Sequence, residues 1–298
     1  MPVVVFAHQR LDVSKNRGHS AENAARFPPS QSGPGAAFRR HFNTTRPLFP
    51  DFVRRRSRLP MKRLFDLSAS ALALLLLSPL LTAAALAVRL SSPGPVLYKA
   101  RRVGRMGQPF VMFKFRTMHA APVQGSVITS SGDARIFPVG RLLRALKIDE
   151  LPQLWNILRG EMSIVGPRPE DPKIVAEHYG HLGHETLTVL PGLTCPGSIH
   201  FYTHGEQLVD DSDPETAYVR NLLPIKLALD AVYVRHQSLL YDIRLIIRTA
   251  LTILQIATGR QRFPEPAEMP EALRILNSTH TAAHTATPAA PLSTTSAA

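Results

Sequence analysis

A run of 22 uncharged residues, Leu67 to Val88, constrains the fold of this chain more than any other feature. A helix of that length rises about 33 Å, which is enough to cross a hydrocarbon core of about 30 Å. Pro79 lies near the middle of the run, where it removes a helix hydrogen bond and bends the axis. Ser78 can donate to a carbonyl that the break frees. Each arm of roughly a dozen residues then reaches only about halfway into a bilayer.

Basic residues flank this run on both sides. They are Arg54, Arg55, Arg56, Arg58, Lys62 and Arg63 before it, and Arg89, Lys99, Arg101, Arg102 and Arg105 after it. Positive charge marks the cytoplasmic side of a membrane segment, so two basic flanks favour a re-entrant hairpin that is broken at Ser78 and Pro79. The broken backbone must then be satisfied inside the protein or by Ser78. A straight span and a buried helix of a soluble core remain as alternatives.

Composition divides the chain into four parts. Residues 1–60 are rich in Arg, Pro, Ser and Gly and predict a disordered basic N-terminal extension. Residues 61–92 hold the helix hairpin, and residues 93–258 are expected to form a cytoplasmic catalytic domain. Residues 259–298 are predicted to be a mostly disordered tail, because the last twenty or so residues are nearly all Ala, Thr, Ser and Pro.

The charge balance points to an anionic partner. The chain has 35 Lys and Arg against 22 Asp and Glu, a formal net charge of +13. Such an excess favours nucleic acid, an anionic lipid leaflet or phosphorylated ligands. The uncharged run fits nucleic acid poorly, so we expect no nucleic-acid partner. Cys195 is the single cysteine, which excludes an internal disulfide and fits a reducing compartment.

Local patterns predict an α+β fold that is mainly helical. Val96–Lys99 suggests a short strand, and a turn is expected at 104–107. Phe110–Met118 alternates, so that Lys114 and Arg116 project together from the face opposite the phenylalanines.

Helical spacing follows over Val139–Leu146. Pro152 suits the first turn of a second helix that reaches Leu158, and Gly160 closes it.

A further helix is expected near the C-terminus. One of its faces is apolar and comprises Leu240, Ile243, Ile247, Ala250, Leu251 and Leu254. Arg244 and Arg248 flank that face. Both a core-packing helix and an amphipathic helix in the membrane interface fit this pattern.

The adjacent acids Asp149 and Glu150 are the strongest catalytic candidates. They fall just before or at the start of the helix that Pro152 begins, where backbone donors and the helix dipole favour carboxylates and bound phosphate. Mg²⁺ uses one or two carboxylates plus substrate oxygens, and an Asp beside Mg²⁺ can attack phosphorus. A bare Asp-Glu pair is usually a solvated surface feature. Nearby cations strengthen this one.

Those cations include Arg144, Lys147 and Arg168. Pro167 and Pro169 stiffen the backbone on either side of Arg168, whose guanidinium can hold a phosphate through two hydrogen bonds or form a structural salt bridge.

Other catalytic patterns are missing from the sequence. It has no phosphate-binding loop that ends in Gly-Lys-Ser/Thr, no GxGxxG motif after a strand, and no cysteine cluster for zinc. His178, His181 and His184 lack a glutamate in the HExxH arrangement and are interpreted as surface residues.

Several ordered motifs resemble the bacterial sugar transferases, the monotopic polyprenyl-phosphate phosphoglycosyl transferases. They are Lys62-Arg-Leu-Phe-Asp66, Ser78-Pro79, Ser92-Pro-Gly-Pro-Val96, Phe113-Lys-Phe-Arg-Thr-Met118, Asp149-Glu-Leu-Pro-Gln153 and Arg159-Gly-Glu-Met-Ser-Ile-Val-Gly-Pro-Arg-Pro169. The similarity is strong over Lys62–Pro169 and extends more loosely to about Ala257. The number and order of the motifs make chance agreement untenable.

The resemblance implies an enzyme on the cytoplasmic face of the bacterial inner membrane. Such an enzyme moves a sugar-1-phosphate from a UDP-sugar to undecaprenyl phosphate and releases UMP, which starts the assembly of exopolysaccharide, capsule, O-antigen or another glycan. It also implies a re-entrant helix-break-helix plus a small catalytic domain with interfacial amphipathic helices. Asp149 is then the nucleophile that forms an aspartyl-phosphosugar, and Glu150 assists with Mg²⁺.

Phosphate binding by Lys114, Arg116, Arg144 and Arg168 is a weaker inference. The oligomeric state stays open, a homodimer included. An inactive membrane-anchored scaffold for glycan assembly is the alternative function, and it would not need Asp149.

The chain departs from the family pattern in three ways. It lacks the four additional N-terminal hydrophobic spans of longer members, so we expect a compact form. Lys147 stands where many members have a hydroxyl residue, and Cys195 stands where glycine is more usual. The identity of the sugar is therefore not transferred.

Overall fold

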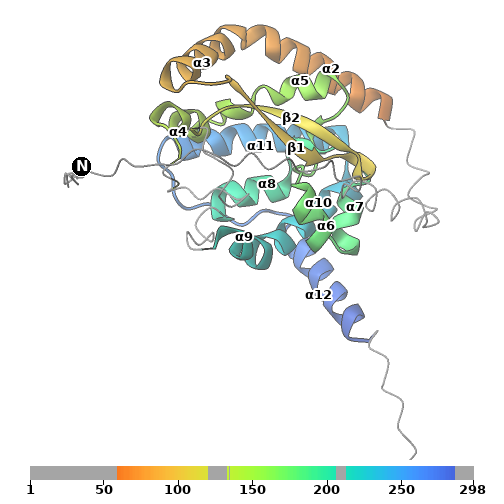
Figure 1. Ribbon diagram of the computed structural model, residues 1–298. Coiled ribbons are helices and arrows are strands. Elements are labelled where there is room, and N and C mark those ends of the chain that lie inside the picture. Colours follow the sequence, from red (N-terminus) through yellow and green to blue (C-terminus); the bar gives the residue numbers. More distant parts are fainter. Residues whose placement is uncertain (1–58, 120–132, 134, 206–212, 286–298) are drawn as a thin grey trace, which may run out of the picture. The chain divides into compact units, whose positions relative to one another are not determined.

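The computed structural model describes residues 59–119, 133, 135–205 and 213–285 (Figure 1). The predicted extension over residues 1–60 therefore lies outside the described residues, except for its last two, which begin the first described helix.

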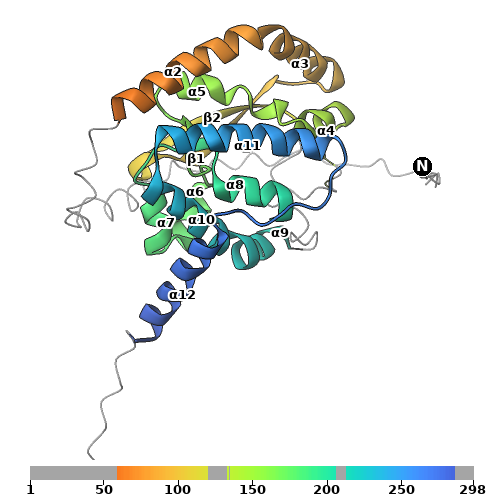
Figure 2. The same cartoon turned by 180° about the vertical axis from the view of Figure 1, so that it is seen from behind.

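The uncharged run forms two helices that meet at a sharp bend. Helix α2 (Leu59–Leu76) and helix α3 (Ser78–Ser91) are inclined by 63° at the break (Figures 1 and 2). Ser78 Oγ donates to the carbonyl of Leu75 at 2.8 Å, as expected for a hydroxyl beside Pro79. Among the described helices no single one is long and apolar enough to cross a bilayer, whereas this bent pair passes that test jointly.

Charged residues at the start of α2 fasten it to the rest of the protein. Lys62 Nζ contacts Asp242 Oδ2 at 2.6 Å and the carbonyl of Val165 at 3.1 Å. Asp66, which is buried, accepts hydrogen bonds from Ser163 Oγ and the Ile164 amide. The first motif of the family resemblance thus anchors the hairpin. Buried charge pairs of this kind persist because each charge has partners.

Two small sheets lie among the helices. Strands β1 (Leu97–Val103) and β2 (Pro109–Phe115) form an antiparallel pair with Ala100 opposite Met112. Strands β3 (Ser163–Val165) and β4 (Gly192–Thr194) form a parallel pair. The first strand is longer than the predicted Val96–Lys99, because the whole segment up to the turn at 104–107 pairs with β2. The predicted α+β, mainly helical class is confirmed.

Helices supply most of the remaining structure. Those on the site side are α4 (Pro138–Ala145) and α5 (Gln153–Leu158), close to their predicted bounds. The others are α6 (Pro172–His178), α7 (His181–Thr186), α8 (Pro196–His200), α9 (Pro214–Ala217), α10 (Leu223–His236), α11 (Leu239–Ala257) and α12 (Met269–Thr285). Helix α10 is buried along most of its length and packs against α7, α8 and α12.

The C-terminal part corrects one prediction. Residues 259–298 were expected to be mostly disordered, yet 269–285 form helix α12. Ala272 and Ile275 of α12 are buried against Ala228, Leu229 and Val232 of α10. For residues 269–285 the expectation was wrong, because the first two turns of this helix have a helical apolar pattern although its Ala- and Thr-rich end does not. Residues 286–298 lie outside the described residues.

Helix α11 does not bury the apolar face that its sequence pattern predicts. Five large apolar side chains on its predicted face are exposed: Leu240, Ile243, Ile247, Leu251 and Leu254. Asp242, Leu245 and Thr252 are buried on the opposite side. The apolar face therefore does not pack into the core of the described protein, and it forms an exposed stripe, here called the α11 stripe.

Candidate active site

A short 3-10 turn, Ile148–Glu150, carries the two acids and connects α4 to α5. Lys147 precedes the turn with a left-handed backbone (φ 54°), a conformation that costs energy for a residue with a side chain. The amide of Glu150 donates to the Lys147 carbonyl, and the amide of Leu151 donates to the Ile148 carbonyl. The tight turn presents Asp149 and Glu150 in different directions just before α5, as the sequence predicts.

Asp149 is buried without a full set of partners. The residue is only 5% exposed, and its Oδ1 atom has no hydrogen-bond partner in the described protein. Burial, together with the neighbouring charge of Glu150, raises its pKa to about 6, against the opposing effect of Lys114, Lys147 and Arg144. A buried carboxylate of this kind remains ionised at neutral pH and is available to react.

Glu150 has the opposite environment. Arg168 donates to both of its oxygens, Nη1 to Oε2 at 2.8 Å and Nη2 to Oε1 at 2.6 Å. Burial favours the neutral acid, but the Arg168 guanidinium outweighs burial and holds the pKa of Glu150 well below its usual range. Of the two roles that the sequence allowed for Arg168, the structure shows the salt bridge, and its partner is Glu150.

Two further cations surround Asp149. Burial lowers the pKa of Lys114, on β2, to about 8, although Asp149 and Glu150 oppose the shift. Burial likewise lowers the pKa of Arg144, on α4, and Asp149 is the strongest charge that opposes it. Arg144 Nε also donates to Thr117 Oγ1 at 2.8 Å. The structure brings Lys114, Arg144 and Arg168 together around the acid pair.

Arg116 does not join them. Its side chain is buried, and its guanidinium donates to the carbonyls of Ser92 and Pro93, both at 2.7 Å. Strand β2 ends at Phe115, so the alternation that predicted a shared face for Lys114 and Arg116 stops one residue too early. Arg116 instead holds the turn that follows α3, and the expectation of two cations presented together was wrong.

Sequence reasoning missed two residues of the site. Tyr202 Oη accepts a hydrogen bond from Arg168 Nη1 at 3.2 Å, and the Lys147 ammonium lies 3.8 Å from the centre of the Tyr202 ring. Asn156, on α5, bonds the amide of Phe113 and the carbonyl of Val111 and so ties α5 to β2. Asn156 lies within a predicted helix and could have been suspected, but no local signal marks Tyr202.

The backbone behind Arg168 is fixed by close packing. A Cβ atom on Gly166 would lie 2.3 Å from the Leu190 carbonyl oxygen, so only glycine fits there. Glu170 forms an ion pair with Lys226 at 2.9 Å and accepts a hydrogen bond from Tyr218. The backbone around Arg168 is therefore fixed on one side by the packing of Gly166 and on the other by the contacts of Glu170.

Other candidates fall outside the site. His178, His181 and His184 are exposed, which confirms the surface interpretation. Among the described residues no group of three or more His, Cys, Asp or Glu side chains is arranged for a metal. The unpartnered Oδ1 of Asp149 does offer one hard oxygen ligand, which fits a cation that takes its remaining ligands from substrate and water.

Comparison with known proteins identifies the family to which this sequence is similar. The family model described as bacterial sugar transferase matches residues 57–256. An undecaprenyl-phosphate glucose phosphotransferase of Komagataeibacter xylinus is 42% identical over 197 residues, which are 63% of this chain and 35% of the relative. A UDP-glucose:undecaprenyl-phosphate glucose-1-phosphate transferase of Caulobacter vibrioides is 37% identical over 205 residues, 65% of this chain and 69% of the relative.

A third relative is matched almost throughout. The exopolysaccharide production protein PSS of Rhizobium leguminosarum bv. phaseoli is 35% identical over 211 residues, 67% of this chain and 98% of the relative. The matched part of the chain thus spans about a third of the Komagataeibacter protein and nearly all of the Rhizobium protein. Together with the family match over residues 57–256, these similarities show that the chain belongs to the bacterial sugar transferase family.

Proposed function

We propose that this protein transfers a sugar-1-phosphate from a UDP-sugar to undecaprenyl phosphate. The observation that carries the proposal is Asp149, a buried carboxylate beside Lys114 and Arg144 with one oxygen that has no hydrogen-bond partner in the described part of the chain. Relatives named for undecaprenyl-phosphate glucose and N-acetylgalactosamine phosphotransferase activities support the reaction class.

Asp149 acts as the nucleophile in this proposal. Its Oδ1 atom forms a bond to the sugar-linked phosphorus while the bond from that phosphorus to the bridging oxygen breaks, and UMP leaves with the electron pair. An oxygen of undecaprenyl phosphate then attacks the same phosphorus and releases the Asp149 carboxylate. One phosphoanhydride replaces another, so no external energy source is needed.

The neighbouring cations have separate roles. In this proposal Lys114 and Arg144 bind phosphoryl oxygens as negative charge shifts toward the leaving group, and their interaction with Asp149 supports that role. Arg168 is already bound to both oxygens of Glu150, so it orients Glu150 and contributes its field. The structure gives Arg116 no such role.

Asp149 and Glu150 would hold Mg²⁺, because the second Asp149 oxygen, Oδ2, is not used in the bond to phosphorus and each Glu150 oxygen retains a lone pair beyond its bond to Arg168. A bound Mg²⁺ would neutralise phosphate charge that otherwise repels the carboxylate.

The membrane placement is also proposed. The bent pair of α2 and α3 would enter one leaflet of the bacterial inner membrane and return, so that the catalytic residues stay on the cytoplasmic face. Chemical labels placed before Arg54 and after Lys99 should report the same, cytoplasmic side. Labels on opposite sides would establish a true span.

The reaction is tested with the purified protein, Mg²⁺ and undecaprenyl phosphate. A panel of UDP-sugars is added and UMP release is measured, followed by mass spectrometry of the trapped protein. We expect UMP from at least one sugar and a phosphosugar adduct on Asp149. Release of UMP without any adduct would reject the covalent mechanism. No release with any sugar would favour the scaffold alternative.

A further inference from the structure

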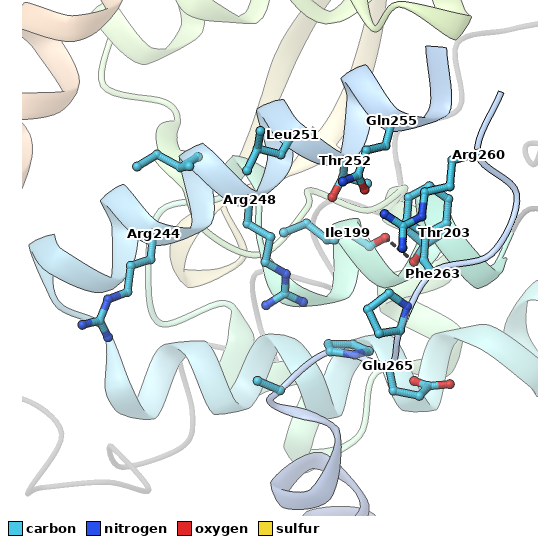
Figure 3. A pocket seen from close by; sticks show the side chains of 14 residues that line it. Ile199, Thr203, Arg244, Arg248, Leu251, Thr252, Gln255, Arg260, Phe263 and Glu265 are labelled. Atoms are coloured by element: carbon cyan, nitrogen blue, oxygen red, sulfur yellow. Dashed lines mark hydrogen bonds between the residues drawn. The ribbon is translucent and has the colours of Figure 1, made fainter. Parts of the chain in front are cut away.

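A cavity on the C-terminal side of the chain contains neither of the two acids. It occupies about 530 Å³ between α11, the end of α8 and the segment 260–267 (Figure 3). Its wall is largely apolar and includes Ile199, Ile247, Leu251, Phe263 and Pro266. The volume is within the range of sites that hold small ligands.

Arginines stand along this cavity. Arg244 and Arg248 lie one helical turn apart at one end, and Arg260 lies toward the other end (Figure 3). Arg248 already forms an ion pair, because its Nη1 donates to both oxygens of Glu268 at 2.9 and 3.0 Å. Arg244 is exposed and makes no hydrogen bond or ion pair within the described part of the chain. The Arg244 end therefore presents a free guanidinium beside a second one that is held in place.

The other end is less suited to an anion. Arg260 lies 5.3 Å from the centre of the Phe263 ring, and its Nε donates to the Arg262 carbonyl. Glu265, an acid, also lines the cavity here, with its oxygens 3.9 Å from nitrogens of His200 and His204. The charge of the cavity is thus positive at the Arg244 end and mixed at the Arg260 end.

The cavity is continuous with the α11 stripe. Ile247 and Leu251 belong to both, and they are 54% and 52% exposed. A ligand at the Arg244 end can therefore lay an apolar chain along Ile247 and Leu251. Apolar surface next to a free cation is complementary to an anionic amphiphile.

We propose that this cavity binds an anionic phospholipid of the surrounding leaflet. The phosphate contacts Arg244 beside Arg248, and the start of an acyl chain lies on Ile247 and Leu251. The proposal rests on the membrane placement proposed above, but not on the transferase reaction, because the site contains neither Asp149 nor Glu150.

The test is a calorimetric titration of the full-length protein with a short-chain lipid, without nucleotide sugar or undecaprenyl phosphate. Dihexanoyl phosphatidylglycerol is expected to bind saturably with one site per chain. Dihexanoyl phosphatidylcholine and inorganic phosphate are each expected to bind at least about tenfold more weakly, because one lacks the net charge and the other the chain. Equal binding of phosphatidylcholine would refute anion selectivity, and equal binding of phosphate would mean a bare anion site.

Two variants probe the assigned residues. Arg244→Gln should weaken phosphatidylglycerol binding about tenfold, which corresponds to the loss of one charge-assisted hydrogen bond. Ala267→Trp, at an exposed position in the wall, should also weaken binding because it fills the cavity without changing its charge. Full binding by either variant contradicts the proposal.

Matched substitutions provide the controls. Arg262→Gln removes an exposed arginine that does not line the cavity, and Arg260→Gln removes the arginine at its other end. Both should bind within about twofold of the parent, because neither side chain is placed on the phosphate. If Arg262→Gln lost as much affinity as Arg244→Gln, binding would reflect diffuse surface charge. An equal loss in Arg260→Gln would overturn the assigned position of the phosphate. Circular dichroism melting confirms that each variant is folded.

Discussion

Burial has different consequences in two neighbouring clusters of charged side chains, one around Glu170 and one at the turn Ile148–Glu150. Around Glu170, Lys226 forms an ion pair with the carboxylate, and Tyr218 donates to it. Burial opposes both charges there, but the pairing lowers the pKa of Glu170 and raises that of Lys226. At the turn Ile148–Glu150, Arg168 satisfies Glu150 in the same way, but one buried oxygen of Asp149 has no hydrogen-bond partner among the described residues.

The two clusters show that a paired buried acid supports the stability of the fold, whereas an unpaired one is suited to chemistry. A paired buried acid is strongly destabilising to remove, because its partner is left uncompensated. An unpaired buried acid costs the folded state energy and is retained where that energy serves chemistry. Asp230 is intermediate between a paired and an unpaired buried acid. It lies 3.7 Å from Lys226, yet burial raises its pKa and its Oδ2 has no hydrogen-bond partner in the described protein.

The sharpest test of the contrast is Asp149→Asn. We expect UMP release to fall at least about a thousandfold, since the nucleophile is lost, while membrane association persists. Asp213→Asn makes the same chemical change at an exposed acid and should leave activity unchanged. Normal turnover by Asp149→Asn would remove Asp149 from the mechanism.

The same variant should not be less stable than the parent. The folded pKa of Asp149 lies near 6, above its ordinary value of 3.8. Its stabilising contribution is therefore complete below about pH 4 and is lost as the pH rises through about 6. Asp149→Asn lacks this loss, so its unfolding free energy relative to the parent should increase over that window. Urea unfolding at pH 4, 5, 6 and 7 measures the difference, and a constant offset would contradict the raised pKa.

Glu170→Gln, unlike Asp149→Asn, should be less stable than the parent. Removing the carboxylate leaves Lys226 buried beside Asp230 alone, and we expect a loss of about 3 kcal/mol in unfolding free energy. Glu215→Gln breaks the more exposed pair with Lys173, which solvent screens, and should cost much less unfolding free energy. Equal losses in the two variants would show that the Glu170 cluster does not support the fold.

Arg168→Lys tests how much activity depends on the ion pair between Arg168 and Glu150. Lysine cannot donate to both Glu150 oxygens in the same plane, so we expect kcat to fall about tenfold to a hundredfold. The pKa of Glu150 should rise at the same time. Arg235→Lys breaks the equivalent bidentate pair with Glu185, which lies outside the site, and should leave kcat unchanged. A kcat equal to that of the parent would contradict the role assigned to Arg168.

The smallest expected effect is on the alkaline side of the pH profile. Activity should fall below about pH 6 as Asp149 gains a proton, and above about pH 8 as Lys114 loses one. Lys114→Arg keeps its charge at higher pH and should move the alkaline limb upward while the acid limb stays. Lys99→Arg, on the exposed edge of β1, is the control and should not move either limb.

The sequence alone was enough to predict those elements that depend on interactions between residues close together in the chain. Pro79 and Ser78 determine the break between α2 and α3, because the missing amide and the returning hydroxyl act within one turn. The start of α5 near Pro152 and its end near Gly160 follow in the same way. Asp149 and Glu150 could be selected because charge, proline and motif order coincide within twenty residues.

Tertiary structure decided which cations reach the acids and which do not. Arg116 and Lys114 are equivalent by alternation, but the end of β2 turns Arg116 onto the Ser92 and Pro93 carbonyls. Tyr202 meets Arg168 across 34 residues of chain. Helix α12 is stabilised by its contact with α10 rather than by its own composition. A sequence pattern records preferences within a few residues, whereas burial and charge pairing depend on which distant segments the folded core brings together.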